Sequence, residues 1–171
     1  PRMTRTPLLM ASLLYGSGLR LNDCMQLRVK DIDFDRQQLA VRRGKGAKDR
    51  YLPHSPRLLV QLREYWRRCR TPLWLFPGHP GDRPMSRHGA SHIYHTAKAK
   101  AGITKSGGIH TLRHCFATDL LEAGTELPVL QRLMGHSSIR STMRYLHIAQ
   151  GQTTATTSPL ELLELPVPAR P

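Results

Sequence analysis

Acidic residues are scarce in this sequence. Of its 171 residues, 12 are Asp or Glu and 26 are Lys or Arg, so the formal net charge at pH 7 is +14. The basic residues are spread along the chain, and no long basic tail is present. A folded basic surface of this kind favours a polyanion as partner, most often nucleic acid. An anionic membrane surface is the alternative, but no basic amphipathic helix stands out.

Long hydrophobic runs and paired cysteines are also missing. No segment approaches the ~20 apolar residues of a membrane-spanning helix, and no signal peptide is visible. Cys24, Cys69 and Cys115 are widely separated and form no C-x-x-C pair. They indicate unreactive thiols in a reducing compartment, so we expect a cytoplasmic protein. Because the sequence begins at Pro1 without Met, close to an expected helix, we expect it to belong to a longer protein.

Residues 109–148 predict three short helices whose ends carry polar side chains. Apolar residues at helical spacing form the buried side of these helices. Thr111 and Thr125 are the expected N-caps of the first two, and Gly124 and Gly135 are their expected stops. Packed apolar faces hold helix ends still, so the arrangement predicts a functional site. The polar residues at or near these ends are His110, Arg113, His136 and Tyr145.

The start of the chain predicts a helix followed by a second possible anion site. Thr6-Pro7 is expected to begin this helix, and residues 16–18 (GSG) are expected to end it. Arg20 follows, just ahead of a short helix that Asn22 is expected to cap. The free N–H groups at a helix N-terminus favour an anion there. An ordinary exposed Arg in a loop is the competing interpretation.

Residues 38–43 and 50–54 predict the two strands of a β-hairpin. Gly44 and Gly46 flank Lys45 in the connecting loop, so the backbone can turn sharply and the ammonium group can reach outward. A loop of this composition also occurs as a solvated turn, and the spacing of a Walker A motif is missing. The hairpin supplies three candidate DNA contacts, Arg43, Lys48 and Arg50.

Two longer helices are expected in the middle of the chain. Ser55 is the expected N-cap of the first, which reaches Cys69, and Trp66 is expected in its buried face. Ser86 is the expected N-cap of the second, which reaches about Ala101. The second helix supplies two more candidate DNA contacts, Arg87 and His88.

Two clusters in the sequence raise the question of a metal. His88, His92 and His95 share one helix face, which zinc sites can use, but no fourth ligand is evident and a basic helix facing solvent or DNA is favoured. Residues 31–35 (DIDFD) alternate carboxylates that could bind Mg²⁺ in a metal-dependent nuclease. A polar strand edge followed by a turn is the favoured interpretation of this segment. We therefore expect neither a metal nor another cofactor.

Five ordered segments together resemble the catalytic domain of a tyrosine recombinase of the phage-integrase and Xer type. Each segment is a weak signal alone, but the ordered set is specific and spans most of residues 8–148. The segments are Gly18-Leu19-Arg20 with Asp31-Ile32-Asp33, Gly44-Lys45-Gly46-x-Lys48-x-Arg50, His110-x-x-Arg113-His114-x-Phe116-Ala117-Thr118, Leu133-x-Gly135-His136-Ser137, and Tyr145, nine residues after His136.

The resemblance implies DNA strand cleavage and rejoining, as in site-specific recombination and integration. Tyr145 would attack a phosphodiester, leaving a 3′-phosphotyrosyl link and a free 5′-hydroxyl. Lys45 would protonate the leaving 5′ oxygen, with Lys48 as the alternative in the same hairpin. A covalent link of this kind keeps the bond energy, so rejoining needs no ATP.

The remaining site residues act on the phosphate in this resemblance. Arg20 and Arg113 would clamp its non-bridging oxygens, His136 would donate a hydrogen bond to it, and His110 would act in general acid–base chemistry. Guanidinium groups suit this task because they bind oxygens bidentately and stay protonated. The family often has Glu at the position of Asp23, where a carboxylate supports the site.

The resemblance also implies an architecture and partners. It implies an α+β, mostly helical fold, a helical bundle with a small antiparallel hairpin or sheet at one side. Residues 1–150 would be the catalytic domain, truncated at its N-terminus, and residues 151–171 a tether with a short docking helix at 159–165. The resemblance also leads us to expect that residues 1–171 do not include the N-terminal core-binding domain of such enzymes. The implied partners are double-stranded DNA and further copies of the chain, as a tetramer in the synapse, in a bacterial nucleoid and without a membrane.

Three alternatives remain open. A DNA-binding module of the same fold without chemistry would behave unchanged with Tyr145→Phe. A metal-dependent nuclease would be sensitive to a chelator. A related topoisomerase would relax supercoils without exchanging DNA partners.

Overall fold

The computed structural model describes residues 5–42 and 49–146. Arg43, Lys45, Lys48 and the docking helix expected at 159–165 lie outside them. The described part is mostly helical with one small antiparallel sheet, which confirms the predicted fold class. No helix in these two ranges has the length and apolar character needed to cross a membrane. In chain order the elements are α1 (Arg5–Ser17), α2 (Leu21–Met25), η1 (Val29–Asp31), β1 (Ile32–Asp33), β2 (Gln38–Val41), β3 (Arg50–Pro53), α3 (Pro56–Cys69), α4 (Arg87–Lys100), α5 (Thr111–Glu122), α6 (Leu127–Met134) and α7 (Arg140–Met143).

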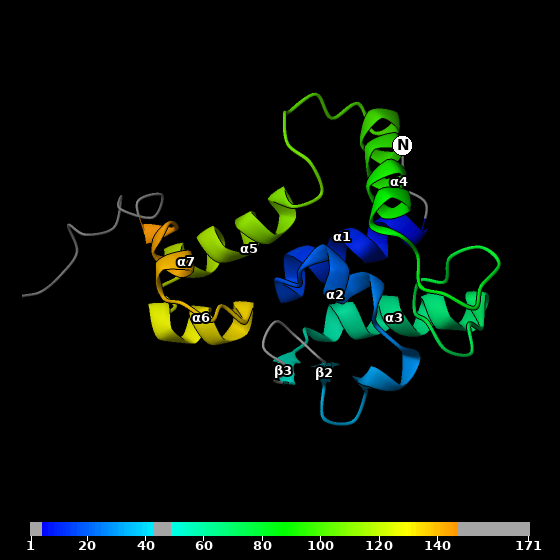
Figure 1. Cartoon of the computed structure of the whole chain (residues 1–171), viewed down its shortest axis with the longest axis horizontal. Coiled ribbons are helices and arrows are strands. Elements are labelled where there is room, and N and C mark those ends of the chain that lie inside the picture. The colour runs from blue at the N-terminus through cyan, green and yellow to red at the C-terminus, as the bar shows by residue number, and fades with distance from the viewer. Residues whose placement is uncertain (1–4, 43–48, 147–171) are drawn as a thin grey trace, which may run out of the picture.

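The larger hydrophobic core is built around α1. Leu9, Leu13 and Leu14 on this helix are buried, and α1 packs against α3, α4 and α5 (Figure 1). Leu62 from α3 and Phe76 from the connection after it are buried in the same core. Because α1 contacts elements from both halves of the chain, it fixes where α5 begins relative to the segment at Arg20.

The small sheet closes one side of this core. β2 pairs antiparallel with β1 and with β3, and Leu39 lies opposite Leu52. Both leucines are buried, while Tyr51 on the opposite face is 64% exposed. This alternation is the pattern of a sheet with one face on the core. It confirms the predicted hairpin.

Protein groups engage two of the three carboxylates of residues 31–35, those of Asp31 and Asp33. Asp31 is buried, accepts a hydrogen bond from the backbone N–H of Arg28 at 3.0 Å and pairs with Arg42 Nε at 2.6 Å. Asp33 accepts the backbone N–H groups of Asp35 and Arg36, which closes the turn into β2. In the described residues, no group of three or more His, Cys, Asp or Glu side chains is placed to hold a metal.

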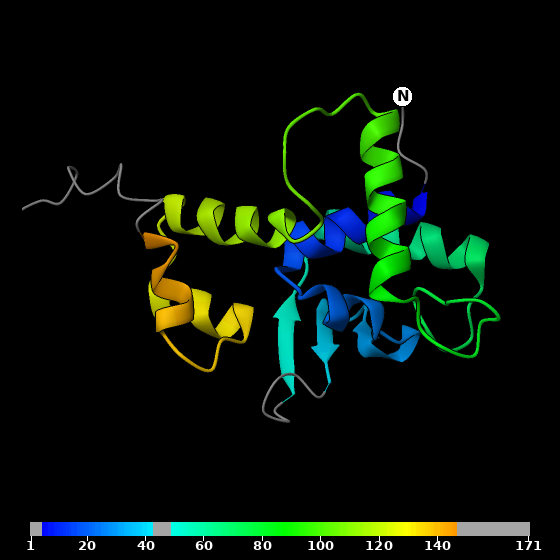
Figure 2. The same cartoon turned by 45° about the horizontal axis from the view of Figure 1, so that its top comes forward.

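A second, smaller core holds the C-terminal helices. Ala117, Leu130, Met134 and Tyr145 are buried together, with Phe116 packed against them. Figure 2 shows α5, α6 and α7 gathered at one end of the molecule, away from α3 and α4. Tyr145 lies in the turn that follows α7.

The helix ends differ from the prediction at three places. The expected N-caps Asn22, Thr111 and Thr125 do not cap, because α2, α5 and α6 begin elsewhere. The cap positions are occupied by Arg20, His110 and Glu126, none of which makes a side-chain cap bond. Ser55 and Ser86 do cap α3 and α4, by accepting backbone N–H groups three residues on.

Trp66 also differs from its predicted place in the core. Its side chain is 41% exposed, and the guanidinium of Arg70 lies 5.2 Å from the ring centroid. The cation covers the ring in place of core packing.

Candidate active site

A cleft of about 480 Å³ lies where the segment after α1 meets α5 and the α6–α7 end of the chain. It contains all the predicted catalytic residues that the structure describes. These are Arg20, His110, Arg113, His136 and Tyr145. Arg87, a predicted DNA contact at the start of α4, also lines the cleft, as do His114 and Arg144. Residues separated by up to 125 positions in the sequence therefore face one space.

Arg113 is anchored deep in this cleft. Its side chain is buried, and its guanidinium donates to the carbonyls of Gly18 and Met134, the latter at 2.8 Å. Gly18 has φ +58, and its backbone lies against the ring of Phe116, which leaves no room for a Cβ. Burial first, then Arg20 and Arg50, lower the pKa of Arg113 to about 10. The group is still a cation at neutral pH.

Arg20 reaches the same helix end from the opposite side. Its Nη2 donates to the carbonyl of Gly135 at 2.7 Å, next to the Met134 carbonyl that Arg113 uses. Carbonyls at a helix C-terminus lack partners within the helix and carry partial negative charge. The end of α6 therefore draws the two guanidinium groups together, despite their mutual repulsion.

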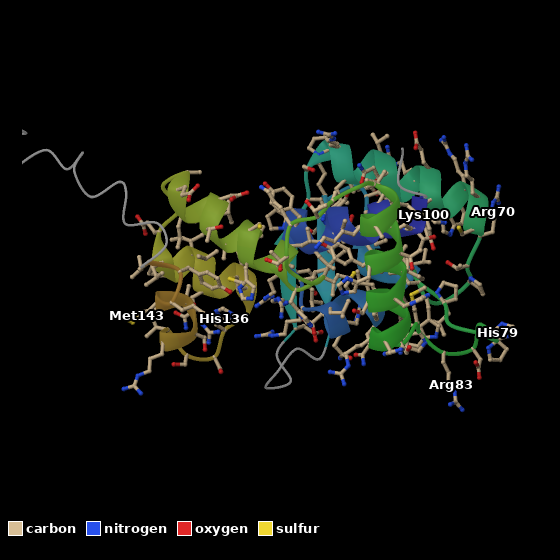
Figure 3. The ribbon with its side chains drawn as sticks, turned by 90° about the horizontal axis from the view of Figure 1, so that it is seen from above. Arg70, His79, Arg83, Lys100, His136 and Met143 are labelled. Carbon is tan, nitrogen blue, oxygen red and sulfur yellow. The ribbon has the colours of Figure 1, made fainter. Side chains whose placement is uncertain are left out.

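His136 follows this helix end and is neutral. Its Nε2 lies 3.0 Å from Arg113 Nη2, and its Nδ1 lies 2.9 Å from the hydroxyl of the buried Thr142. Because an arginine has donors only, Nε2 must accept and Nδ1 must carry the proton. Burial first, then Arg113 and Arg20, lower the pKa of His136 to about 4. In Figure 3, His136 lies on the side of the α6–α7 end that faces the rest of the chain, and Met143 lies on the far side.

Tyr145 is buried, and its hydroxyl meets an imidazole. The Oη atom lies 2.9 Å from Nδ1 of His114, and the two rings are tilted at 46° with centroids 5.7 Å apart. Burial raises the pKa of Tyr145, whereas Arg113 and Arg144 act to lower it. Burial also lowers the pKa of His114, and Arg144 and Arg113 add to that effect.

His114 lines the cleft and contacts Tyr145, although it was not among the site residues predicted from the sequence. It stands in the H-x-x-R-H segment, four residues after His110, so the two histidines lie one above the other on α5. That spacing is the signal that could have found it. His110 itself is exposed at the N-cap position of α5.

Arg50, predicted as a DNA contact, is instead packed inside the protein. Its side chain is 13% exposed, and Nη2 lies 2.9 Å from Asp23 Oδ2. The same carboxylate lies 3.9 Å from Arg20 Nη1. A Cβ on Gly135 would come within 2.5 Å of the Arg50 guanidinium. Arg50 therefore links β3 to both Asp23 and the α6 end, while His88 stays exposed on α4, outside the residues that line the cleft.

The sequence was compared with models of known protein families. The model described as the phage integrase family matches residues 4–152. The chain belongs to the phage integrase family. The resemblance to tyrosine recombinases is thereby confirmed, and the α+β fold of the chain is that of their catalytic domains.

Individual members of the phage integrase family agree with this assignment. A Sinorhizobium fredii protein named as a candidate integrase/recombinase, y4qK, is 43% identical over 157 residues, which cover 92% of this chain and 51% of that protein. Tyrosine recombinase XerA of Pyrococcus furiosus is 35% identical over 160 residues, covering 91% of this chain and 55% of that protein. The chain thus spans about half the length of these relatives.

A solved structure shares the fold at lower identity. The XerH site-specific recombinase, bound to a palindromic difH substrate in a post-cleavage complex, superposes with a TM-score of 0.74 at 24% identity. The superposition covers 88% of this chain and 45% of that one.

Proposed function

We propose that this phage integrase family chain is the catalytic part of a tyrosine-type site-specific recombinase. It cleaves and rejoins double-stranded DNA without a metal, through a 3′-phosphotyrosyl intermediate. The observation that carries the proposal is the cleft in which Tyr145 lies with Arg20, Arg113 and His136. The DNA complex of the structurally similar XerH supports DNA as the partner.

The two arginines suit a phosphate undergoing attack. The transition state gains charge on its non-bridging oxygens, and guanidinium groups fixed in advance stabilise that charge without reorganisation. Arg113 is fixed by two carbonyls, and Arg20 is fixed by a third. Lys45, which lies outside the described residues, is proposed from the family resemblance to protonate the 5′ leaving oxygen.

A bound phosphate would change the state of His136. In the DNA-free arrangement its Nε2 accepts from Arg113 and has no proton to donate. The negative charge of a bound phosphate would oppose the effect of Arg113 and Arg20 and raise the low pKa of His136. The imidazole then gains the proton with which it donates to the phosphate, as the family resemblance implies.

The proposal extends to the parts of the protein that DNA exchange requires. Residues 1–150 form the catalytic unit, and residues 151–171 form a tether and docking helix. Self-association as a tetramer in the synapse, association with the bacterial nucleoid, and DNA contacts by Arg43, Lys48, Arg87 and His88 belong to the same proposal. Their support is the family resemblance and, for Arg87, its place on the cleft wall.

A chelator-resistant covalent complex tests the proposal. The protein is mixed with nicked duplexes made from the DNA that flanks its gene, in EDTA, and separated in SDS. A cleaved short strand diffuses away from such a nick, which traps the intermediate. We expect an SDS-stable protein–DNA band that Tyr145→Phe abolishes. Firm DNA binding without a band would instead support a binding module without chemistry, and cleavage that EDTA abolishes would support a nuclease.

A further inference from the structure

We propose that His114 is the proton acceptor for the hydroxyl of Tyr145. The inference rests on the proposed function, and it adds a catalytic residue to the predicted set. Its basis is geometric: Nδ1 of His114 lies 2.9 Å from the Tyr145 Oη, and both side chains line the same cleft. The contact joins residues 31 positions apart, on α5 and after α7.

The donor and acceptor of this bond follow from the groups around it. Arg113 and His110 face His114 from its own helix, and Arg144 faces it from the segment after α7. Together with burial they lower the pKa of His114, so the imidazole is neutral at pH 7. The phenol of Tyr145, whose pKa is raised, carries its proton. The phenol therefore donates, Nδ1 accepts, and the imidazole proton is on Nε2.

The proton transfer balances without another reactant. As the bond from Tyr145 Oη to phosphorus forms, the O–H bond breaks and its proton moves to Nδ1 of His114. The bond from phosphorus to the 5′ oxygen breaks, and that oxygen takes a proton from the acid on its own side of the phosphate. In rejoining, the 5′-hydroxyl attacks phosphorus and gives its proton back to the group on its own side of the phosphate. The bond from phosphorus to the Tyr145 oxygen breaks, and the imidazolium of His114 returns its proton to that oxygen.

This assignment divides the work between the two histidines of α5. His110 is exposed at the helix start and lines the cleft, where it is free to approach a phosphate. His114, one turn further along, contacts the nucleophile itself. A general base must lie within hydrogen-bond reach of the proton it removes, and His114 meets that condition.

Substitution by Asn separates proton acceptance from positioning. The Oδ1 atom of Asn can stand where Nδ1 stands and accept the bond from Tyr145, but it cannot take the proton. We expect His114→Asn and His114→Ala to slow formation of the covalent complex at pH 7 by about 10²-fold or more. Their rates should rise with pH up to the pKa of Tyr145, whereas the wild-type rate levels off at lower pH. His79→Asn, exposed in the connection between α3 and α4, is the matched control and should keep the wild-type rate.

Three outcomes overturn the inference. A wild-type rate in His114→Asn would mean that the residue only positions Tyr145. If the wild-type protein forms the covalent complex and His114→Ala forms it at the same rate, His114 has no role in the reaction. The proposed function would still stand. Absence of a Tyr145-dependent band in the wild type, at sites that the protein binds, would overturn the proposed function and this inference with it.

A measurement on the wild-type protein tests the inference even if the His114 variants fail to fold. ¹⁵N NMR of labelled histidine reports which ring nitrogen carries the proton. We expect His114 as the Nε2–H tautomer at pH 7, with an unprotonated Nδ1 that accepts a hydrogen bond. A protonated Nδ1 could not accept from Tyr145 and would overturn the inference.

Discussion

Arg20 and Arg113 line the same cleft but differ in burial and in what they contact. Arg113 is buried and links two distant segments of the chain, because its guanidinium donates to the carbonyl of Gly18, after α1, and to that of Met134, at the end of α6. The Arg20 side chain is partly exposed; within residues 5–42 and 49–146 it donates to the carbonyl of Gly135 and lies 3.9 Å from the carboxylate of Asp23. We therefore expect Arg113 to contribute to both stability and the proposed reaction, and Arg20 to contribute mainly to the proposed reaction.

Alanine substitutions should separate these roles. We expect Arg113→Ala and Arg20→Ala each to slow covalent-complex formation by about 10²- to 10³-fold. Only Arg113→Ala should also lower the free energy of unfolding, by about 1.5–3 kcal/mol, because its loss leaves two buried carbonyls without a donor. Urea unfolding and the rate of complex formation measure the two effects. Equal stabilities in the two variants would contradict the anchoring role of Arg113.

The neutral state of His136 predicts how stability depends on pH. The folded pKa is about 4 and the ordinary value is 6.5, so between these values the unfolded chain binds more protons. Stability is therefore complete above about pH 6.5 and falls as the pH drops toward 4. His54 and His114, whose pKa values are also lowered, act in the same direction. In His136→Gln, whose amide oxygen can accept a hydrogen bond from Arg113, stability should decrease less steeply as the pH drops. Thermal unfolding at several pH values measures this decrease. An identical fall would contradict the assignment.

At the scale of elements, the C-terminal turn of α6 organises the site. Gly135 has φ +61 and caps the helix, its carbonyl accepts from Arg20, and its Cα faces the Arg50 guanidinium. Gly124 after α5 also has a positive φ, +85, but a Cβ there would meet nothing within 4 Å. The two glycines thus share backbone strain and differ in their surroundings.

Alanine at these glycines is a matched pair of variants. Gly124→Ala should cost about 1–2 kcal/mol from the left-handed backbone and keep the rate of complex formation. Gly135→Ala should cost more stability and reduce the rate, because the new methyl group displaces Arg50 and with it the Asp23 contact. Urea unfolding and SDS gels measure both. A Gly135→Ala variant as active and stable as Gly124→Ala would contradict this account of the turn.

The elements themselves were largely predictable, and their ends were not. The spacing of apolar residues predicted α3, α4 and the β2–β3 hairpin. Ser55 and Ser86 correctly predicted where the two helices begin. Thr111 and Thr125 failed as caps because tertiary contacts decide where α5 and α6 begin. Arg20, for example, occupies the cap position of α2, and its side chain donates to the carbonyl of Gly135, which is 115 residues away in the sequence.

At the scale of the molecule, the fold brings together residues that local patterns cannot relate. The family resemblance predicted the members of the cleft by position in a motif. It could not predict that Arg50 would pair with Asp23 inside the protein, because that contact depends on how β3 lies against α2. Nor could it predict that His114 would meet Tyr145, because that contact depends on how the segment after α7 lies against α5. The hydrogen bond between Tyr15 of α1 and Asp119 of α5, at 2.5 Å, is a further contact of this long-range kind.

The net charge of +14 predicts a strong dependence of DNA affinity on salt. If about five phosphates are contacted, the slope of log K against log salt concentration should be about −4 to −5, because each contact releases bound counterions. Fluorescence anisotropy with a labelled duplex at several salt concentrations measures the slope. An affinity that does not change with salt would contradict DNA as the partner.

The central claim is that Tyr145 becomes covalently linked to the 3′ phosphate of a DNA strand. The most direct test isolates the SDS-stable complex formed in EDTA, digests protein and DNA, and locates the nucleotide on the peptide by tandem mass spectrometry. We predict a 3′-phosphotyrosyl adduct on Tyr145 and a free 5′-hydroxyl on the released strand. An adduct on any other residue, or a 5′-phosphate on the released strand, would contradict the account.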